Sequence, residues 1–216
     1  MPAARHVVIT AAGIGSRLGM NMPKCLVSVG GRPIVDHQLD QLRDIEDVRI
    51  VVGFQRDAVI EHVRNIREDV VFVLNSAYAS TTVLQSLALG VVGLDEPFIA
   101  LDGDVIPEPN SFKRFLRACE QRTPLTTYCR TKSTEPVYAY IDEPADGRPA
   151  VLLELARSPS SMWEWPGISY LEPEMIEPRS TFVFEQVRRH LPMAAIEIEC
   201  WEVDTPEDLQ IAEREL

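Results

Sequence analysis

The sequence has little positive charge for its length. Its 21 Lys and Arg residues are outnumbered by 33 Asp and Glu residues, which gives a formal net charge of −12. Nucleic-acid binding generally requires a basic surface, so we expect no nucleic-acid partner. An acidic protein that binds a polyanionic ligand must gather its few cations at one place or recruit a metal ion.

Long hydrophobic runs and paired cysteines are also missing. No apolar stretch approaches the roughly 20 residues of a membrane span, so we expect no membrane partner. The first ten residues, MPAARHVVIT, are too short and too mixed for a signal peptide. The four cysteines form no CxxC pair, which favours free thiols in a cytoplasmic protein over disulfides or structural zinc.

Short β-branched runs alternate with helical patterns through the first 120 residues. The pattern predicts strands at 6–10, 48–54, 70–75 and 97–104, and helices at 33–44, 56–66, 82–92 and 111–121. Repeated β-α-β units of this spacing predict a mainly parallel sheet with helices on both faces.

After residue 123 the pattern changes to strands joined by short turns. We expect strands at 125–129, 137–143 and 150–156, a loop at 158–167, a strand at 168–174, a helix at 180–191, a strand at 195–203 and a helix at 206–216. The fold class is therefore α/β: a Rossmann-like mixed, mostly parallel sheet flanked by helices, with a small antiparallel excursion. Without repeats or long linkers, we expect a single domain over residues 1–216.

The stretch after the first strand, AAGIGSRLGMNMPKCLVSVGG (11–31), carries the main functional signal. Two known phosphate motifs are excluded, because Leu18 stands where the Rossmann fingerprint needs a third glycine and no Walker A pattern is present. A strand followed by AAGxGxR and then PK remains to be explained.

The glycines and cations of this stretch are suited to anion binding. Gly13 and Gly15 remove side chains where the backbone must approach a ligand and leave N–H groups free to donate. Arg17 can bond two phosphate oxygens, and Lys24 supplies a point charge. Ligands bind at the carboxyl ends of strands in open α/β sheets, where this loop lies. A tight turn with two solvated cations is the alternative.

Acidic residues end two predicted strands. Asp102 and Asp104 in ALDGDVIP point to the same side of an extended chain, and such acids beside a phosphate loop suit Mg²⁺. The alternative is an Asp-Gly turn. Asp204 in WEVDTPEDL ends the last strand, where it competes with Thr205 as N-cap of the final helix.

The segment AAGIGSRLG…PKCLVSVGGRPIVDHQLDQL resembles the N-terminal signature of the nucleotidylyltransferases that build nucleoside-diphosphate sugars and CDP-alcohols. The resemblance implies that the glycine loop holds base and phosphates. It implies triphosphate contacts for Arg17 and Lys24, and Mg²⁺ ligation by Asp104 and Asp204. The segments NSAYASTTVLQSLALG, CRTKSTEPVYAYID and GISYLEPE look most like CTP:phosphocholine cytidylyltransferases.

The sequence thus predicts a Mg²⁺-dependent nucleotidylyltransferase with Arg17 and Lys24 as catalytic residues. Its partners would be a nucleoside triphosphate, with CTP preferred, and a small phosphorylated acceptor: a phosphocholine-like compound, an alditol phosphate, a phosphonate or a sugar phosphate. The alternatives are a sugar-1-phosphate enzyme that uses UTP, dTTP or GTP, a glycosyltransferase that uses an NDP-sugar, and a nucleotide sensor. An oligomer remains possible.

Two further sets of residues complete the predicted site. The predicted nucleotide-binding residues are Ala11, Ala12, Gly13, Gly15, Ser16, Arg17, Lys24, Ser80, Thr81, Thr82 and Asp102. The predicted acceptor-binding residues are Lys132, Trp163, Trp165 and Tyr170. For the two tryptophans, core packing or an interface is the alternative, and for Lys132 a solvated loop position.

Overall fold

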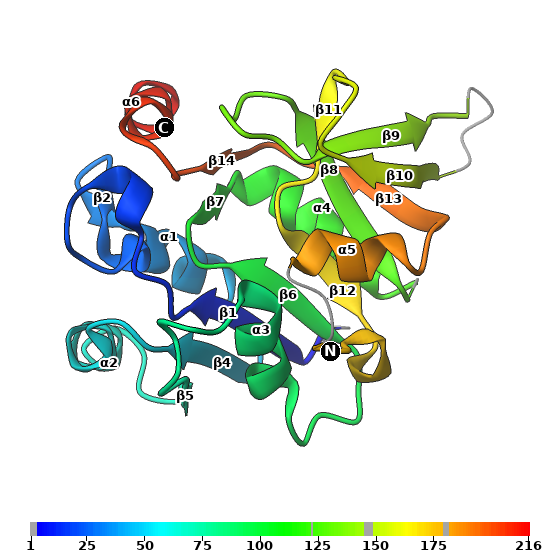
Figure 1. The fold of residues 1–216 in the computed structure, drawn as a ribbon. Helices are drawn as coiled ribbons and strands as arrows, with labels where there is room; N and C mark the ends of the chain where they lie inside the picture. The colour runs from blue at the N-terminus through cyan, green and yellow to red at the C-terminus, as the bar shows by residue number, and fades with distance from the viewer. Residues whose placement is uncertain (1–3, 122, 145–148, 179–181) are drawn as a thin grey trace.

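The computed structural model describes residues 4–121, 123–144, 149–178 and 182–216. Its main feature is a ten-stranded mixed sheet with the order β11-β9-β10-β13-β8-β12-β6-β1-β4-β5 (Figure 1). The strands are β1 (His6–Ala11), β4 (Asp47–Val52), β5 (Val71–Leu74), β6 (Phe98–Asp102), β8 (Leu125–Arg130), β9 (Tyr138–Asp142), β10 (Ala150–Ala156), β11 (Trp163–Glu164), β12 (Ile168–Leu171) and β13 (Met193–Glu197).

Two short sheets and the helices complete the described fold. The short sheets pair β2 (Ser28–Val29) with β3 (Arg32–Pro33), and β7 (Val105–Pro107) with β14 (Cys200–Glu202). The α-helices are α1 (Ile34–Gln41), α2 (Arg56–Arg64), α3 (Val83–Val91), α4 (Pro109–Cys119), α5 (Val183–Arg188) and α6 (Pro206–Glu215). Three 3₁₀ turns occur at η1 (Ser16–Leu18), η2 (Lys24–Leu26) and η3 (Pro173–Met175).

The N-terminal part of the sheet is parallel, as the β-α-β pattern predicts. Strand β1 pairs in parallel with β4 and β6, and β4 pairs in parallel with β5. This arrangement puts the carboxyl ends of β1 and β6 side by side. The residues that follow these two strands are the glycine-rich loop and the Asp-Gly-Asp turn.

The C-terminal part is antiparallel apart from the β8–β13 pair. The strand expected at 195–203 is two strands, because the chain leaves the main sheet after β13 and β14 pairs with β7 instead. The strand expected at 168–174 ends at Leu171, before η3, and the loop expected at 158–167 contains β11. Helix α5 is shorter than expected, and residues 180 and 181 of that prediction lie outside the described part.

Alternate residues of β1 pack on opposite faces of the sheet. Val7 and Ile9 belong to the core formed with α1, α2 and α4, whereas Val8 belongs to the core formed with α3 and α5. Glycine at position 90 lets α3 lie close to the sheet, since a Cβ there would overlap the side chain of Val8. Strand β1 is thus buried on both faces, which explains its run of β-branched residues.

A third apolar cluster anchors the glycine-rich loop beside β7, β14 and α6. It contains Leu18, Val27, Val29, Ile34, Ile106, Trp201, Val203 and Ala212. This cluster holds the loop that follows β1 next to the residues that follow β14. Among the described residues, none of the helices is long and apolar enough to cross a membrane.

Candidate active site

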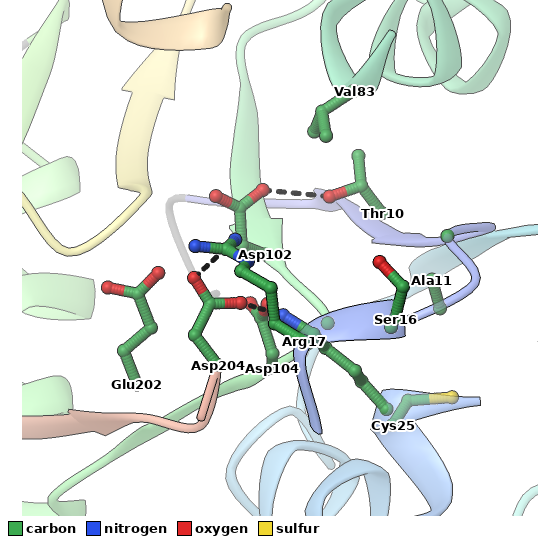
Figure 2. A pocket seen from close by; sticks show the side chains of 14 residues that line it. Thr10, Ala11, Ser16, Arg17, Cys25, Val83, Asp102, Asp104, Glu202 and Asp204 are labelled. Carbon is green, nitrogen blue, oxygen red and sulfur yellow. Dashed lines mark hydrogen bonds and ion pairs between the residues drawn. The ribbon is translucent and has the colours of Figure 1, made fainter. Parts of the chain in front are cut away.

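A pocket of about 290 Å³ lies at the carboxyl ends of β1 and β6, next to the end of β14 (Figure 2). Its lining residues are Thr10, Ala11, Gly13, Gly15, Ser16, Arg17, Lys24, Cys25, Val83, Asp102, Gly103, Asp104, Glu202 and Asp204. The pocket therefore contains both predicted cations and all three predicted aspartates, although these residues come from distant parts of the chain.

Gly13 and Gly15 of the loop differ in why the structure accommodates glycine there. Gly15 has φ +65°, and a Cβ there would lie 2.7 Å from Cγ of Lys24. Glycine at this position thus lets the Lys24 side chain cross the loop into the pocket. A Cβ at Gly13 would meet no atom of the described residues within 4 Å, so packing within the chain does not require glycine there. The approach of a ligand to the backbone at Gly13 stays a prediction.

The loop cations form ion pairs with carboxylates across the pocket. Lys24 Nζ lies 2.9 Å from Oδ2 of Asp104 and also pairs with Oδ1 of Asp204. Arg17 Nη2 lies 2.6 Å from Oδ2 of Asp204, and its Nη1 lies 2.7 Å from Oε2 of Glu135. Both cations therefore have carboxylate partners, with the Lys24 side chain 16% exposed and the Arg17 side chain 49% exposed.

Three acidic residues form a cluster at the pocket. Asp104, Glu202 and Asp204 each offer a carboxylate oxygen, and these three oxygens lie within 4.8 Å of one another. The β7–β14 sheet brings them together, since the backbone N–H of Val203 donates to the carbonyl of Asp104 at 2.9 Å. Three hard oxygen donors are the ligand type that Mg²⁺ prefers.

Glu202 is absent from the predicted site. The sequence pattern could have predicted Glu202 as a site residue. Glu202 and Asp204 are separated by one residue at a strand end, in the same way as Asp102 and Asp104.

Thr205, and not Asp204, caps the last helix. The backbone N–H of Asp208 donates to Oγ1 of Thr205 at 3.2 Å, and the N–H of Thr205 donates to Oδ2 of Asp208 at 2.8 Å. This reciprocal pair is a capping box. The carboxylate of Asp204 therefore does not cap α6, and it faces the pocket.

Burial and neighbouring acids perturb two carboxyl groups of the pocket. Burial raises the pKa of Asp102 to about 7, and the negative charge of Asp104 adds to this rise. Burial also raises the pKa of Glu202 to about 8, again with a contribution from Asp104. Both shifts arise mainly from burial, and Lys24 offsets only part of them, so a further cation near Asp102 and Glu202 would favour their ionised forms.

Asp102 lies at the wall of the pocket. Its Oδ1 accepts a hydrogen bond of 2.8 Å from Oγ1 of Thr10. On its other side, a Cβ at Gly167 would overlap the Asp102 carboxylate, and Gly167 has φ +74°, which favours glycine. The side chain is thus held against two backbone segments, while Asp104 points into the carboxylate cluster.

The segment predicted to contact the base borders a smaller cavity of about 60 Å³. Thr81 and Thr82 line this cavity, together with Ala12, Gly13 and Tyr78. Thr82 also caps α3 through the N–H of Gln85. Ser80 lines neither of these two cavities, and its hydroxyl donates to the carbonyl of Ala77.

Asn75 supports this segment and is absent from the predicted site. It is 2% exposed, and its Nδ2 donates to Oγ1 of Thr81 at 2.7 Å and to Oγ of Ser86 at 2.9 Å. The Thr81 hydroxyl is therefore held from two sides, since it accepts from the buried amide of Asn75 and donates to the carbonyl of Ala77 at 3.1 Å.

The four predicted acceptor residues do not line the pocket in the part of the chain that the structure describes. Lys132 Nζ pairs with Glu215 at 3.1 Å, near the C-terminus. Trp163 and Trp165 belong to the core that contains α3 and α5, and Tyr170 belongs to the opposite core. For the tryptophans, this placement agrees with the core-packing alternative.

Comparisons with known proteins point to nucleotide chemistry. A family model described as a MobA-like NTP transferase domain matches residues 7–162. The CMP-5'-(3-aminopropyl)phosphonate synthase of Streptomyces rubellomurinus is 38% identical over 122 residues, which are 53% of this chain and 19% of that protein. The chain spans less than a third of the length of the curated relatives that it matches.

Two solved structures share the fold over nearly the whole chain. The CTP:phosphocholine cytidylyltransferase from Streptococcus pneumoniae has a TM-score of 0.77 and 20% identity, with 97% of each chain covered. The inositol-1-phosphate CTP transferase from T. maritima has a TM-score of 0.79 and 15% identity, with 98% of this chain and 94% of that chain covered. At these identities the likeness establishes the fold, and the expected mixed α/β class is confirmed.

Proposed function

Since the chain belongs to the MobA-like NTP transferase domain family, we propose that it is a Mg²⁺-dependent nucleotidyltransferase that transfers CMP from CTP to a small phosphorylated or phosphonate acceptor and releases pyrophosphate. One observation carries this proposal: the two loop cations and the three clustered carboxylates share one pocket at the carboxyl ends of β1 and β6. Cations suit the triphosphate, and the carboxylates suit the metal ion that accompanies it.

Asp104, Glu202 and Asp204 would hold the metal ion. They fit a hard divalent cation because all three offer carboxylate oxygens and because their mutual repulsion favours added positive charge. When bound, Mg²⁺ supplies charge neutralisation at the triphosphate and at the leaving pyrophosphate.

Arg17 and Lys24 would contact phosphate oxygens. In the structure they pair with Asp204 and Asp104, the same carboxylates that we assign to the metal. When the nucleotide and the metal ion bind, the two cations would exchange these carboxylates for phosphate oxygens, and the carboxylates would exchange the cations for the metal ion. The planar guanidinium of Arg17 can bond two phosphate oxygens at once, whereas Lys24 provides a compact charge. Together they would fix the triphosphate relative to the acceptor.

The reaction would depend on alignment more than on proton transfer. A phosphate acceptor is already largely dianionic at pH 7, so its oxygen can attack the α-phosphorus without a general base. As the new P–O bond forms, the bond from the α-phosphorus to the pyrophosphate oxygen breaks, and the leaving group takes that electron pair. Positioning and electrostatic stabilisation are the contributions expected from the protein.

The choice of CTP is supported by what similar proteins are called. The phosphonate synthase carries CMP in its name, and the two solved structures are named for CTP. Where phosphocholine enzymes tend to have asparagine, this chain has Ser80, Thr81 and Thr82, so a sugar-1-phosphate enzyme that uses UTP, dTTP or GTP is the second candidate. A glycosyltransferase ranks lower, because it has no need of Arg17 and Lys24 for a triphosphate.

Pyrophosphate release tests the proposal. The chain would be incubated with Mg²⁺, each common nucleoside triphosphate, and a panel containing phosphocholine, 3-aminopropylphosphonate, an alditol phosphate and sugar 1-phosphates. We expect pyrophosphate only where CTP and one acceptor class are both present. Release with UTP, dTTP or GTP and a sugar 1-phosphate would favour the second candidate, and no release with any pair would contradict nucleotidyl transfer. An Asp104→Ala variant controls for contaminating activity.

A further inference from the structure

A buried glutamine on α1 fastens the turn that carries Asp104. Gln38 is 1% exposed, and its Nε2 donates to the carbonyl oxygen of Asp102 at 2.8 Å and to that of Val105 at 2.7 Å. These two carbonyls flank Gly103 and Asp104. One side chain from a helix 64 residues earlier in the chain therefore spans the whole turn.

Backbone contacts hold the same turn from two other directions. The N–H of Gly103 donates to the carbonyl of Thr10 at 3.1 Å, and the N–H of Val203 donates to the carbonyl of Asp104 at 2.9 Å. A Cβ at Gly103 would lie 2.7 Å from the Thr10 oxygen, so the turn needs glycine to approach β1 this closely. The Asp104 backbone is thus fixed to β1, to the end of β14 and to α1.

Glutamine has the chemistry that this position requires. A neutral amide provides two N–H donors at the end of a side chain long enough to leave the helix, and both donors are used here. Lysine or arginine would bury a charge, and an apolar side chain would leave two inward-facing carbonyls without this partner. Loss of the amide therefore favours movement of the turn toward other donors, and Asp104 would move with it.

We propose that Gln38 is a positioning residue that sets the place of the Asp104 carboxylate for divalent metal binding. This inference rests on the proposed function insofar as Asp104 is taken as a metal ligand. Gln38 does not line the pocket, so it acts through the turn and not by contact with metal or nucleotide.

Gln41 provides a matched control on the same helix. It lies one turn later in α1, and its Nε2 donates to the carbonyl of Pro107 at 2.7 Å, at the far end of β7. The Gln41→Met change removes the same kind of helix-to-strand hydrogen bond as Gln38→Met. Only the Gln38 bonds, however, hold the Asp104 turn itself.

Binding of Mn²⁺ alone, followed by electron paramagnetic resonance, tests the inference without reference to activity. The full chain and the Gln38→Met and Gln41→Met variants would be titrated, and each would be checked by thermal unfolding. We expect both variants to melt at lower temperature than the parent chain. We expect Gln38→Met to bind Mn²⁺ about 10- to 100-fold more weakly, as for other residues that orient metal ligands, and Gln41→Met to bind within twofold of the parent.

The outcomes separate the inference from the proposed function. Mn²⁺ binding by the parent chain with no change in Gln38→Met, or with an equal loss in both variants, would overturn the role of Gln38 and leave the metal site standing. No Mn²⁺ binding by the parent chain would overturn the metal site, and the inference with it. Should Gln38→Met fail to fold, Gln38→Asn keeps an amide on a shorter side chain, and the same weakening is expected.

Discussion

The ammonium of Lys24 lies 2.9 Å from the carboxylate of Asp104. Both side chains are largely buried, with 16% and 20% of their side-chain surface exposed, so the pair is shielded from solvent. The lysine comes from the loop after β1 and the aspartate from the turn after β6, which are adjacent parallel strands. Strand order thus places a cation of the proposed phosphate site against an acid of the proposed metal site.

The Lys24→Met variant should lose much of its activity. Removing a desolvated charge partner costs about 2–5 kcal/mol, which we expect as a matching loss in kcat/KM for the nucleotide. Steady-state pyrophosphate release measures it. Lys113→Met, on the exposed side of α4, is the control and should behave like the parent chain. Equal kinetics for both variants would show that Lys24 only neutralises carboxylates.

The Asp104→Ala variant should lose turnover while it keeps its fold. Its carboxylate points into the pocket and its backbone keeps the bonds to Val203 and the rest of the turn. Loss of such a preorganised electrostatic group typically costs about 10²-fold or more in kcat. Turnover would be measured at limiting and at saturating Mg²⁺, with circular dichroism to check the fold. Turnover near that of the parent chain at limiting Mg²⁺ would exclude Asp104 as a metal ligand.

Asp204 and Thr205 are neighbours with separable roles. We expect Asp204→Asn to lose most activity and to need more Mg²⁺, because an amide is a poorer metal ligand than a carboxylate. We expect Thr205→Ala to lose about 1 kcal/mol of unfolding free energy through the lost N-cap and to keep its activity. Denaturant unfolding and the pyrophosphate assay give both quantities. A stability loss in Asp204→Asn with full activity would reverse the two assignments.

How much of the site could be predicted depends on how local its signals are. Arg17 and Lys24 lie in the glycine-rich loop after β1, Asp104 lies two residues after β6, and the parallel order of these two strands brings them together. Gln38 carries no such signal, because its two hydrogen bonds are set by the tertiary packing of a buried amide within a helix. Asn75 directly follows β5 and so has a strand-end position, but the sequence does not show that its amide is buried against Thr81 and Ser86.

For the acceptor site, a local sequence pattern was present but did not identify residues of the pocket. Aromatic residues in a proline-bounded loop suggest a binding site, but Trp163 and Trp165 have 8% and 7% of their surface exposed. The indole N–H of Trp165 donates to Oγ1 of Thr126 inside the sheet. Burial of large aromatic surface is strongly favourable, and the sequence alone does not tell whether a ligand or the core buries it.

Glu135 should compete with the nucleotide for Arg17. The pair joins Nη1 to Oε2 at 2.7 Å, and 49% and 66% of the two side chains are exposed. A pair this exposed is worth at most about 1 kcal/mol. We therefore expect Glu135→Gln to lower the KM for the nucleotide up to about fivefold at low salt, with less effect at high salt. Glu154→Gln, which removes a surface pair with Arg188, is the control. A raised KM would mean that Glu135 helps to orient Arg17.

CTP should stabilise the folded chain more than the other nucleoside triphosphates. A ligand that binds only the folded state at about 100 Kd adds roughly 2.7 kcal/mol to the unfolding free energy, so a thermal-shift screen with Mg²⁺ ranks the nucleotides directly. The Asn75→Ala variant links the ranking to the base site, because it removes the donor that holds the Thr81 hydroxyl beside the small cavity. We expect it to reduce the shift by CTP while the shift by pyrophosphate, which has no base, stays unchanged. Stabilisation by UTP, dTTP or GTP without CTP would overturn the choice of base and move the acceptor toward sugar 1-phosphates.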